Sequence, residues 1–256
     1  MKHQEDSKEY LAKKAKFEKI ITIYGRNAVL EALEDPDAIA VSLHLSQSNL
    51  DADVLDTIVK LAKEQNAEIK THNKAALSRI SKNAKQDQGV ALDIQSPNYQ
   101  SAVSYLEDLP MHAKIIALDG INNPQNLGMI IRSVAASKVD ALILPKKNSA
   151  KISPLVIKAS AGALFKAKIL FCDSLEDIIP KYKALGFEAI MLSSHSQESL
   201  FDLGRIPRSL YVLGNESDGV SSNVEKLCSK KVLIPMENGV ESLNVAITAA
   251  LIAFNQ

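Results

Sequence analysis

The sequence predicts an α/β fold: a mainly parallel sheet sandwiched by helices, preceded by a small α/β domain. Two observations lead to this class. Apolar runs of strand length alternate with helix-period runs along most of the chain, which is the pattern of a sheet covered by helices. The run at 114–118 is apolar at nearly every position, as strands are when both faces of a parallel sheet are buried.

A small first domain is expected at 20–95, after an N-terminal extension of mixed charge at 1–19. Its expected strands are 20–24, 40–45, 67–71 and 90–94, and its expected helices are 28–33, 53–64 and 75–81. The polar residues around Pro97 predict a linker, which we place at 96–112.

A second, larger domain is expected at 113–256, where the alternation resumes with stronger signals. Its expected strands are 114–118, 141–144, 167–171, 187–192, 210–213 and 232–234, and its expected helices are 127–137, 154–163, 175–185, 222–228 and 245–254. Alternation of this length implies three layers around the sheet.

The segment 232–254 combines residues in an unusual way. Pro235 ends an apolar run, a polar loop follows, and 245–254 is apolar almost all round. Ser242 stands where a helix N-cap is expected. Asn244 would lie in the first turn of this apolar helix. It is either a satisfied buried amide or, together with Ser242, part of a ligand loop between a strand end and a helix start.

Composition is ordinary for a soluble globular protein. Of the 256 residues, 46% are hydrophobic and 23% are charged. The formal net charge is zero, which argues weakly against a general nucleic-acid binder. No apolar run approaches the length of a membrane span. Cys172 and Cys228 stand far apart and outside any CxxC pattern, so we interpret them as reduced core residues of a cytoplasmic protein.

Positive charge is concentrated in two stretches that lack acidic residues, at 69–86 and 141–172. They predict two local positive faces or, alternatively, ordinary solvated surfaces. The basic residues concerned are Lys70, Lys74, Arg79, Lys82, Lys85, Lys146, Lys147, Lys151, Lys158, Lys166 and Lys168.

Three loops follow expected strand ends, where parallel sheets bind ligands. They are DGINNPQN at 119–126, LGNESDG at 213–219 and PMENGVESLN at 235–244. None matches GxGxxG or GxxxxGK[ST], so an unrelated α/β enzyme for nucleotides or small molecules is a poor alternative. The five histidines are scattered, and no metal site is expected.

Two charges near these loops need a physical reason. Arg132 lies in the apolar run GMIIRSVAA, and Glu216 lies in a tight turn directly after a strand. Either the two form a structural ion pair, or Arg132 binds phosphate or ribose oxygens.

In order and spacing, LDGINNPQNLGMIIRSVAA, LYVLGNESDGVSS and LIPMENGVESLNVAITAAL resemble the three motifs of the SpoU/TrmH branch of SPOUT RNA methyltransferases. YGRNAVLEAL and DQGVALDI resemble that branch's N-terminal substrate-binding domain, which is similar to a small ribosomal protein fold. The likeness covers nearly the whole chain after the extension, and it is strongest to the group that methylates a guanosine ribose of 23S ribosomal RNA.

This resemblance implies an enzyme that uses S-adenosylmethionine to methylate a ribose 2′-hydroxyl of RNA. It also implies a C-terminal trefoil knot and a homodimer joined through the knot region. RNA, ribosomal RNA above all, is the expected partner, without a membrane or a metal. A transfer RNA ribose methyltransferase and a non-catalytic RNA-binding protein on the same fold are the alternatives.

The resemblance also assigns site residues. The catalytic set is Asn126, Arg132, Glu216, Ser242 and Asn244, and the cofactor set is Leu213, Gly214, Asn215, Glu216, Gly219, Ile234, Met236, Ser242, Leu243 and Asn244. For RNA contacts we predict Arg26, Asn27, Lys146, Lys147 and Lys151. Ser217 and Ala246 depart from the family's usual Gly and Ser, which would loosen cofactor contacts modestly, and Phe165 stands where an acidic residue is common.

Overall fold

The computed structural model describes residues 20–36, 38–48, 53–81, 87–95, 99–194 and 196–255. The chain divides into two compact units, Met1–Tyr99 and Gln100–Gln256. The extension expected at 1–19 lies outside the described residues.

The first unit contains a mixed four-stranded sheet. Its strands are β1 (Ile20–Tyr24), β2 (Ile39–Ser46), β3 (Glu68–His72) and β4 (Val90–Gln95), in the order β1-β4-β2-β3. Strand β4 is antiparallel to β1 and β2, and β3 is parallel to β2. The helices are α2 (Arg26–Glu34), α3 (Asp53–Glu64) and α4 (Lys74–Ser81). The sequence predicted each of these elements, with small differences at their ends.

The two faces of this sheet differ in polarity because side chains alternate along each strand. One face carries buried apolar residues such as Ile23, Leu43 and Leu92, and buried residues of α2 and α3 complete that core. The opposite face carries Thr22, His44 and Asp93, which are hydrogen-bonded to one another.

A mainly parallel seven-stranded sheet, as predicted, forms the centre of the second unit. Its order is β11-β9-β10-β6-β7-β8-β5, and the five pairs from β11 to β8 are all parallel. The strands are β5 (Tyr99–Ser101), β6 (Ala113–Leu118), β7 (Ala141–Pro145), β8 (Ile169–Cys172), β9 (Glu188–Leu192), β10 (Arg208–Leu213) and β11 (Lys230–Val232).

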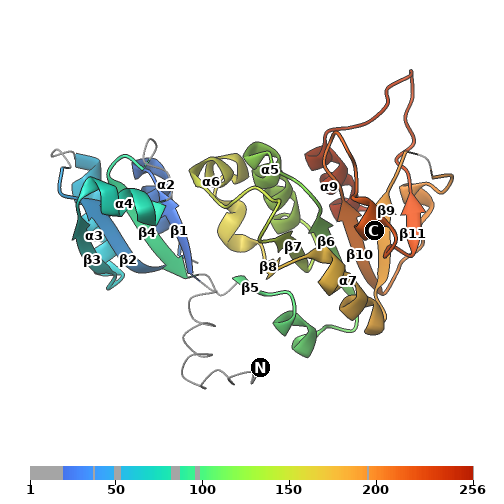
Figure 1. Cartoon of the computed structure of the whole chain (residues 1–256), viewed down its shortest axis with the longest axis horizontal. Helices are drawn as coiled ribbons and strands as arrows, with labels where there is room; N and C mark the ends of the chain where they lie inside the picture. Colours follow the sequence, from blue (N-terminus) through green and yellow to red (C-terminus); the bar gives the residue numbers. More distant parts are fainter. Residues whose placement is uncertain are drawn as a thin grey trace, which may run out of the picture. The chain divides into compact units, whose positions relative to one another are not determined.

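Helices cover this sheet in two layers (Figure 1). In one layer α5 packs against α6 and α9, and in the other α7 packs against α8 and β9. Ile115, Val212 and Tyr182 belong to the core beneath α7. The bounds are α5 (Pro124–Ala135), α6 (Pro154–Ser160), α7 (Leu175–Ala184), α8 (Ser222–Glu225) and α9 (Val245–Phe254), with short 3-10 turns η1 (Ser104–Asp108), η2 (Ala163–Lys166) and η3 (Leu200–Asp202).

Helices α5 and α6 approach closely at Gly128. A Cβ atom at this position would lie 2.5 Å from the Cβ of Ala159 and 2.7 Å from the carbonyl oxygen of Val156. Any larger residue would push the helices apart, so Gly128 fixes α5, the helix that carries Asn126 and Arg132, against its neighbour.

The segment predicted as a linker at 96–112 contains regular structure in its described part. Strand β5 and η1 both fall within it, and the division between the two units comes at Tyr99. The backbone N–H of Ala102 donates to the carbonyl of Phe171 at 2.9 Å, and the hydroxyl of Tyr182 donates to the carbonyl of Ala102 at 3.0 Å. Of the residues in this short strand only Tyr99 is buried, so no apolar run marks the strand in the sequence.

The last strand is also displaced from its prediction. It was expected at 232–234, but β11 spans Lys230–Val232. The two lysines look unlike a strand, yet Lys230 pairs with Glu198 at 3.0 Å and Lys231 with Glu225 at 2.5 Å. An edge strand tolerates such charged residues because its side chains reach solvent.

None of the helices in the described ranges is long and apolar enough to cross a membrane. Cys172 and Cys228 are free thiols. Burial raises the pKa of Cys172 to about 12 and that of Cys228 to about 11. Both thiols therefore stay protonated at neutral pH and are poor nucleophiles.

Candidate active site

The first two of the predicted loops lie at the ends of neighbouring strands. Strands β6 and β10 are parallel and adjacent, so the loops after Leu118 and Leu213 leave the same edge of the sheet. The backbone N–H of Asp119 donates to the carbonyl of Leu213 at 2.8 Å, and the carboxylate of Asp119 accepts from the N–H of Ser221 at 2.7 Å. These bonds connect the two loops directly.

One buried amide joins all three loops. Asn126 lies in the first turn of α5 and is 5% exposed. Its Nδ2 donates to Oε1 of Glu216 in the second loop. Its Oδ1 accepts from Nδ2 of Asn244 in the third loop, at 3.1 Å. The three segments that the sequence singled out therefore meet at a single side chain.

The start of α5 is held in place by the residue before it. The side chain of Asn123 is the N-cap and accepts from the backbone N–H groups of Gln125 and Asn126, at 2.8 and 3.4 Å. Pro124 occupies the first helical position, where a missing N–H carries no penalty. This cap orients Asn126 toward the other two loops.

The second loop is a tight, internally bonded turn. The side-chain oxygen of Asn215 accepts from the N–H groups of Ser217 and Asp218, at 2.8 and 2.7 Å. A Cβ on Gly214 would lie 1.9 Å from the carbonyl carbon of Gly219, so only glycine fits where the loop closes on itself. This turn presents Glu216 to Asn126.

Asn244, rather than Ser242, is the N-cap of α9. Its Oδ1 accepts from the N–H of Ala246 at 2.8 Å, while its Nδ2 donates to Asn126. The N-cap prediction for Ser242 is therefore wrong, and Asn244 is exposed rather than buried. Both residues can cap a helix, and the apolar run alone did not distinguish which position starts it.

Arg132 is exposed on α5 and has no ion-pair partner among the residues that the structure describes. The alternative of a structural ion pair with Glu216 is wrong, because Glu216 bonds to Asn126 instead. Helices α5 and α9 pack against each other, so Arg132 is on the same side of the sheet as the helix that follows the third loop. Its guanidinium is available to an anionic or polar ligand.

The predicted cofactor residues on and beside the second and third loops differ in exposure. Leu213 is buried, whereas Ile234, Met236 and Leu243 are half-buried. Ser242 is exposed, and a Cβ on Gly219 would meet nothing within 4 Å. Apolar side chains, an accessible backbone and a carboxylate suit a ligand with both an apolar and a polar part.

The predicted RNA residues differ in their surroundings. Arg26 and Asn27 line a hollow of about 590 Å³ in the first unit. Lys146 pairs with Asp173 at 3.2 Å, and Lys147 lines a hollow with Asp119, Asp173, Glu176 and Asp177. The stretch at 141–172 contains no acidic residue. In the structure, however, Asp173 and the acidic residues at the start of α7 lie beside its lysines, so this surface is not uniformly positive. Lys151 is exposed, while Lys82 and Lys85 lie outside the described residues.

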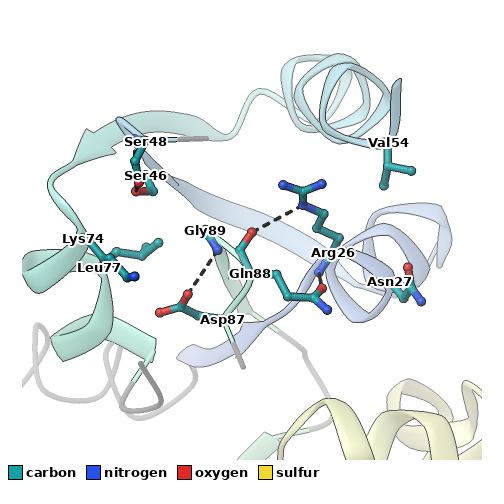
Figure 2. Close-up of a pocket in the computed structure, with 10 residues that line it drawn as sticks. All are labelled: Arg26, Asn27, Ser46, Ser48, Val54, Lys74, Leu77, Asp87, Gln88 and Gly89. Carbon is teal, nitrogen blue, oxygen red and sulfur yellow. Dashed lines mark hydrogen bonds between the residues drawn. The ribbon is translucent and has the colours of Figure 1, made fainter. Parts of the chain in front are cut away.

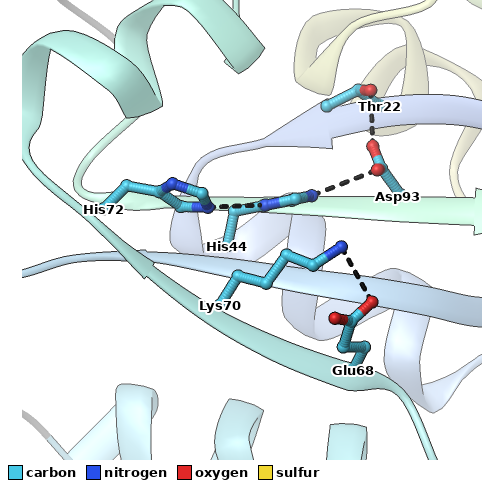
Figure 3. Close-up of polar contacts among 6 residues, drawn as sticks. All are labelled: Thr22, His44, Glu68, Lys70, His72 and Asp93. Atoms are coloured by element: carbon cyan, nitrogen blue, oxygen red, sulfur yellow. Dashed lines mark hydrogen bonds and ion pairs between the residues drawn. The ribbon is translucent and has the colours of Figure 1, made fainter.

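Sequence reasoning missed a polar chain across the first sheet (Figure 3). Nδ1 of His44 lies 3.0 Å from Nε2 of His72, and Nε2 of His44 lies 3.1 Å from Oδ2 of Asp93. The hydroxyl of Thr22 donates to the other oxygen of Asp93 at 2.6 Å. These residues come from four different strands, so no local motif could reveal the chain.

This chain shifts the ionisation of two members. Burial alone would raise the pKa of Asp93, but the hydrogen bonds from His44 and Thr22 outweigh it and leave the pKa lowered. Burial and the nearby His44 and Lys70 lower the pKa of His72. Within the described part of the chain, no group of three or more potential ligands could hold a metal ion.

Comparison with known protein families gives one match in each of the two units. Residues 113–254 match the model of the SpoU rRNA Methylase family, and residues 22–100 match that for RNA 2′-O ribose methyltransferase substrate binding. The chain belongs to the SpoU rRNA methylase family. The resemblance inferred from the three motifs is thereby confirmed.

Two relatives span almost the whole chain. A TrmH-family tRNA/rRNA methyltransferase of Staphylococcus epidermidis is 32% identical over 91% of this chain and 94% of its own. The 23S rRNA (guanosine-2′-O-)-methyltransferase RlmB of Neisseria meningitidis is 30% identical over 90% of this chain and 92% of its own.

Solved structures share the fold. The SpoU methyltransferase AviRb from Streptomyces viridochromogenes, in complex with AdoMet, superposes with a TM-score of 0.67 at 20% identity, covering 98% of this chain and 92% of its own. An AdoMet-bound rRNA methyltransferase from Sinorhizobium meliloti gives 0.66 at 20% identity, covering 95% and 89%.

Proposed function

We propose that this protein transfers a methyl group from S-adenosylmethionine to a ribose 2′-hydroxyl of RNA, with ribosomal RNA as the substrate. The observation that carries the proposal is the junction at Asn126, which ties Glu216 and Asn244 into one site beside the helix of Arg132. Membership of the SpoU family supports the reaction, and the match of residues 22–100 supports RNA as the substrate.

The cofactor would lie between the second and third loops. Ile234, Met236 and Leu243 would cover its apolar parts, and the open backbone at Gly219 would approach its polar parts. Glu216 would place negative charge near its sulfonium. Bound there, the cofactor supplies a methyl group that is already activated for transfer, so the protein's task is alignment.

Arg132 would act on the hydroxyl rather than on the methyl donor. A guanidinium stays protonated in proteins, so it is a poor general base. Next to the hydroxyl and its phosphate it would stabilise the negative charge that develops on oxygen, while the hydroxyl proton passes to water and S-adenosylhomocysteine leaves. One such donor contributes roughly 3–4 kcal/mol to catalysis.

We also propose that the C-terminal segment forms a trefoil knot. Strand β11 lies at an edge of the sheet, whereas α9 packs against α5 and β10. The ammonium of Lys114, in β6, donates to the carbonyls of Ile252 and Asn255 at the end of α9. The chain therefore leaves the edge and returns to the middle of the sheet, which is the course a knot requires.

The active form would be a homodimer in which α9 contributes the interface. Ile247, Ala250, Leu251 and Phe254 follow helical spacing and form one apolar stripe. Ile247 is 52% exposed and Phe254 is 58% exposed, and Met129 on the adjoining α5 is 42% exposed. A second copy of the same face would cover these side chains.

A ribosomal substrate is favoured over transfer RNA because the chain has a separate substrate-binding unit at its N-terminus, which we assign to 20–95. The relative RlmB is named as a methyltransferase of a guanosine in 23S rRNA. A guanosine of the large ribosomal RNA is therefore the first target to examine. Cytoplasmic residence is part of this proposal, because both cysteines, Cys172 and Cys228, are free thiols.

The test is to map ribose methylation in total RNA from cells with and without this protein, alongside calorimetry of S-adenosylmethionine binding. One ribose methylation that depends on the protein is expected, together with saturable cofactor binding. Binding of RNA without cofactor binding or methylation would favour the non-catalytic alternative.

A further inference from the structure

We propose that the hollow in the first unit binds one nucleotide of single-stranded RNA, turned out of its strand. The site is the space of about 590 Å³ at the carboxyl ends of β1 and β2, next to the starts of α2 and α4. It is lined by Arg26, Asn27, Ser46, Ser48, Val54, Lys74, Leu77, Asp87, Gln88 and Gly89 (Figure 2). This inference rests on the proposed function, because it takes RNA as the ligand.

Two cations on opposite sides of the hollow are free to bind phosphate. Arg26 and Lys74 come from different helices, and Figure 2 shows them on either side of the turn at Gln88 and Gly89. Neither has an ion-pair partner in the described part of the chain. Successive phosphates of one strand can contact both cations, and such contacts position RNA without reading its sequence.

Hydrogen bonds hold the floor of the hollow in place. The N–H of Arg26 donates to the side-chain oxygen of Gln88 at 2.9 Å, and its Nε donates to the Gln88 carbonyl at 3.4 Å. This second bond holds the guanidinium against the turn and leaves both terminal nitrogens for a ligand. Gln88 and Gly89 have φ values of 50° and 78°, a conformation fixed by these contacts and by the carboxylate of Asp87.

The carboxylate of Asp87 is buried and hydrogen-bonded beside the turn at Gln88 and Gly89. It is 6% exposed, and its two oxygens accept from the hydroxyl of Ser81 and the N–H of Gly89, each at 3.1 Å. Both of its oxygens are therefore occupied within the turn. The other polar side chains that line the hollow are cationic, amide or hydroxyl groups, which suit a sugar–phosphate backbone.

One apolar side chain at the edge of the hollow gives a base a surface to pack on. Val54 is 37% exposed, whereas Leu77, at 1% exposed, only closes the lining. The hydroxyls of Ser46 and Ser48 lie 2.9 Å apart and can bond to ribose or base edges. The volume falls within the range of small-ligand sites, so it accommodates one nucleotide rather than a duplex. Sequence-specific recognition of RNA mostly targets such unpaired nucleotides.

The experiment measures binding of a labelled single-stranded oligoribonucleotide of mixed sequence, and of its duplex, to the full chain over a range of salt. Lys74→Ala and Arg26→Ala should each weaken single-strand binding about three- to tenfold and reduce the salt slope by about one. Lys60→Ala is the matched control, because Lys60 is an exposed lysine of the same unit, on α3.

A second variant separates the nucleotide from the phosphates. Ser48→Tyr fills the hollow without changing its charge, so it should weaken single-strand binding while leaving the salt slope and the duplex unaffected. Melting temperatures of the variants report whether the fold is kept. The proposal is overturned if Lys74→Ala behaves like Lys60→Ala, if Ser48→Tyr binds as tightly as the unchanged protein, or if the protein does not bind the single strand.

Cofactor binding, measured on the same variants, keeps this inference distinct from the proposed reaction. The hollow is not part of the predicted cofactor site, so S-adenosylmethionine affinity should be unchanged. If the variants bind the single strand normally while methyl transfer is intact, only the proposed nucleotide site is wrong. If the variants weaken single-strand binding but the protein transfers no methyl group, only the proposed reaction is wrong.

Discussion

The amide of Asn126 donates to the carboxylate of Glu216, across a separation of 90 residues in sequence. The oxygen of the same amide accepts from Asn244, which lies 118 residues after Asn126 in sequence. An Asn side chain can do this because it holds a donor and an acceptor at the two ends of one planar group. A carboxylate could not satisfy both partners, since Glu216 needs a donor.

Asn126→Asp should therefore separate the second loop from the first. It places a carboxylate against the carboxylate of Glu216 and removes a hydrogen bond to a charged group, which is worth about 1.5–3 kcal/mol. We expect a lower melting temperature and at least tenfold weaker S-adenosylmethionine binding by calorimetry.

Asn123→Asp is the control for this change. Asn123 accepts two backbone N–H bonds as the N-cap of α5, and aspartate caps a helix equally well. It should leave both measurements close to those of the unchanged protein. Equal behaviour of the two variants would mean that the junction at Asn126 does not organise the site.

Arg132→Ala should reduce kcat about 10²–10³-fold, the usual effect of removing one donor to a developing negative charge. Cofactor affinity should change little, because Arg132 is exposed and makes no ion pair within the described ranges. Single-turnover methyl transfer with saturating cofactor measures this. Lys138→Ala removes a nearby exposed charge and should have little effect. Near-normal kcat in Arg132→Ala would exclude this residue from the reaction.

The strands and the three loops could be predicted from sequence because their signals are local. Continuous apolar runs identify strands such as β6, and the motif residues Asn126, Glu216 and Asn244 are close to those runs. Their meeting at one amide could not be derived from spacing, since it depends on how strands order themselves in the sheet. The resemblance to a family supplied that step.

Other features depend on tertiary contacts that no local pattern encodes. The acid-free stretch at 141–172 suggested a positive face, but Asp173 pairs with Lys146 in space. Strand β5 looked like a linker because it has only one buried residue, Tyr99, and is a strand only through its pairing with β8. The hollow between Arg26 and Lys74 likewise combines residues from every connection of the first sheet.

Ile247→Asp should convert a dimer into a monomer. The substitution places a charge on the exposed apolar stripe of α9, where a partner would have to desolvate it. Sedimentation measures the change. Leu185→Asp is the control, because Leu185 is 41% exposed at the end of α7, in the opposite helical layer. If both variants stay dimeric, or the unchanged protein is a monomer, the α9 interface is wrong.

Acid should destabilise the first unit through its polar chain. The lowered pKa of His72 means that folding favours the neutral imidazole, so its contribution is present above the ordinary value of 6.5 and is lost as pH falls below it. Asp93 has a pKa below its ordinary 3.8, so its contribution is lost at still lower pH. We therefore expect the melting temperature to fall from about pH 6.5 downward. His72→Gln should flatten the upper part of this decline, whereas His112→Gln, at an exposed site of the second unit, should not. A decline that is the same in both variants would show that protonation of His72 does not oppose folding.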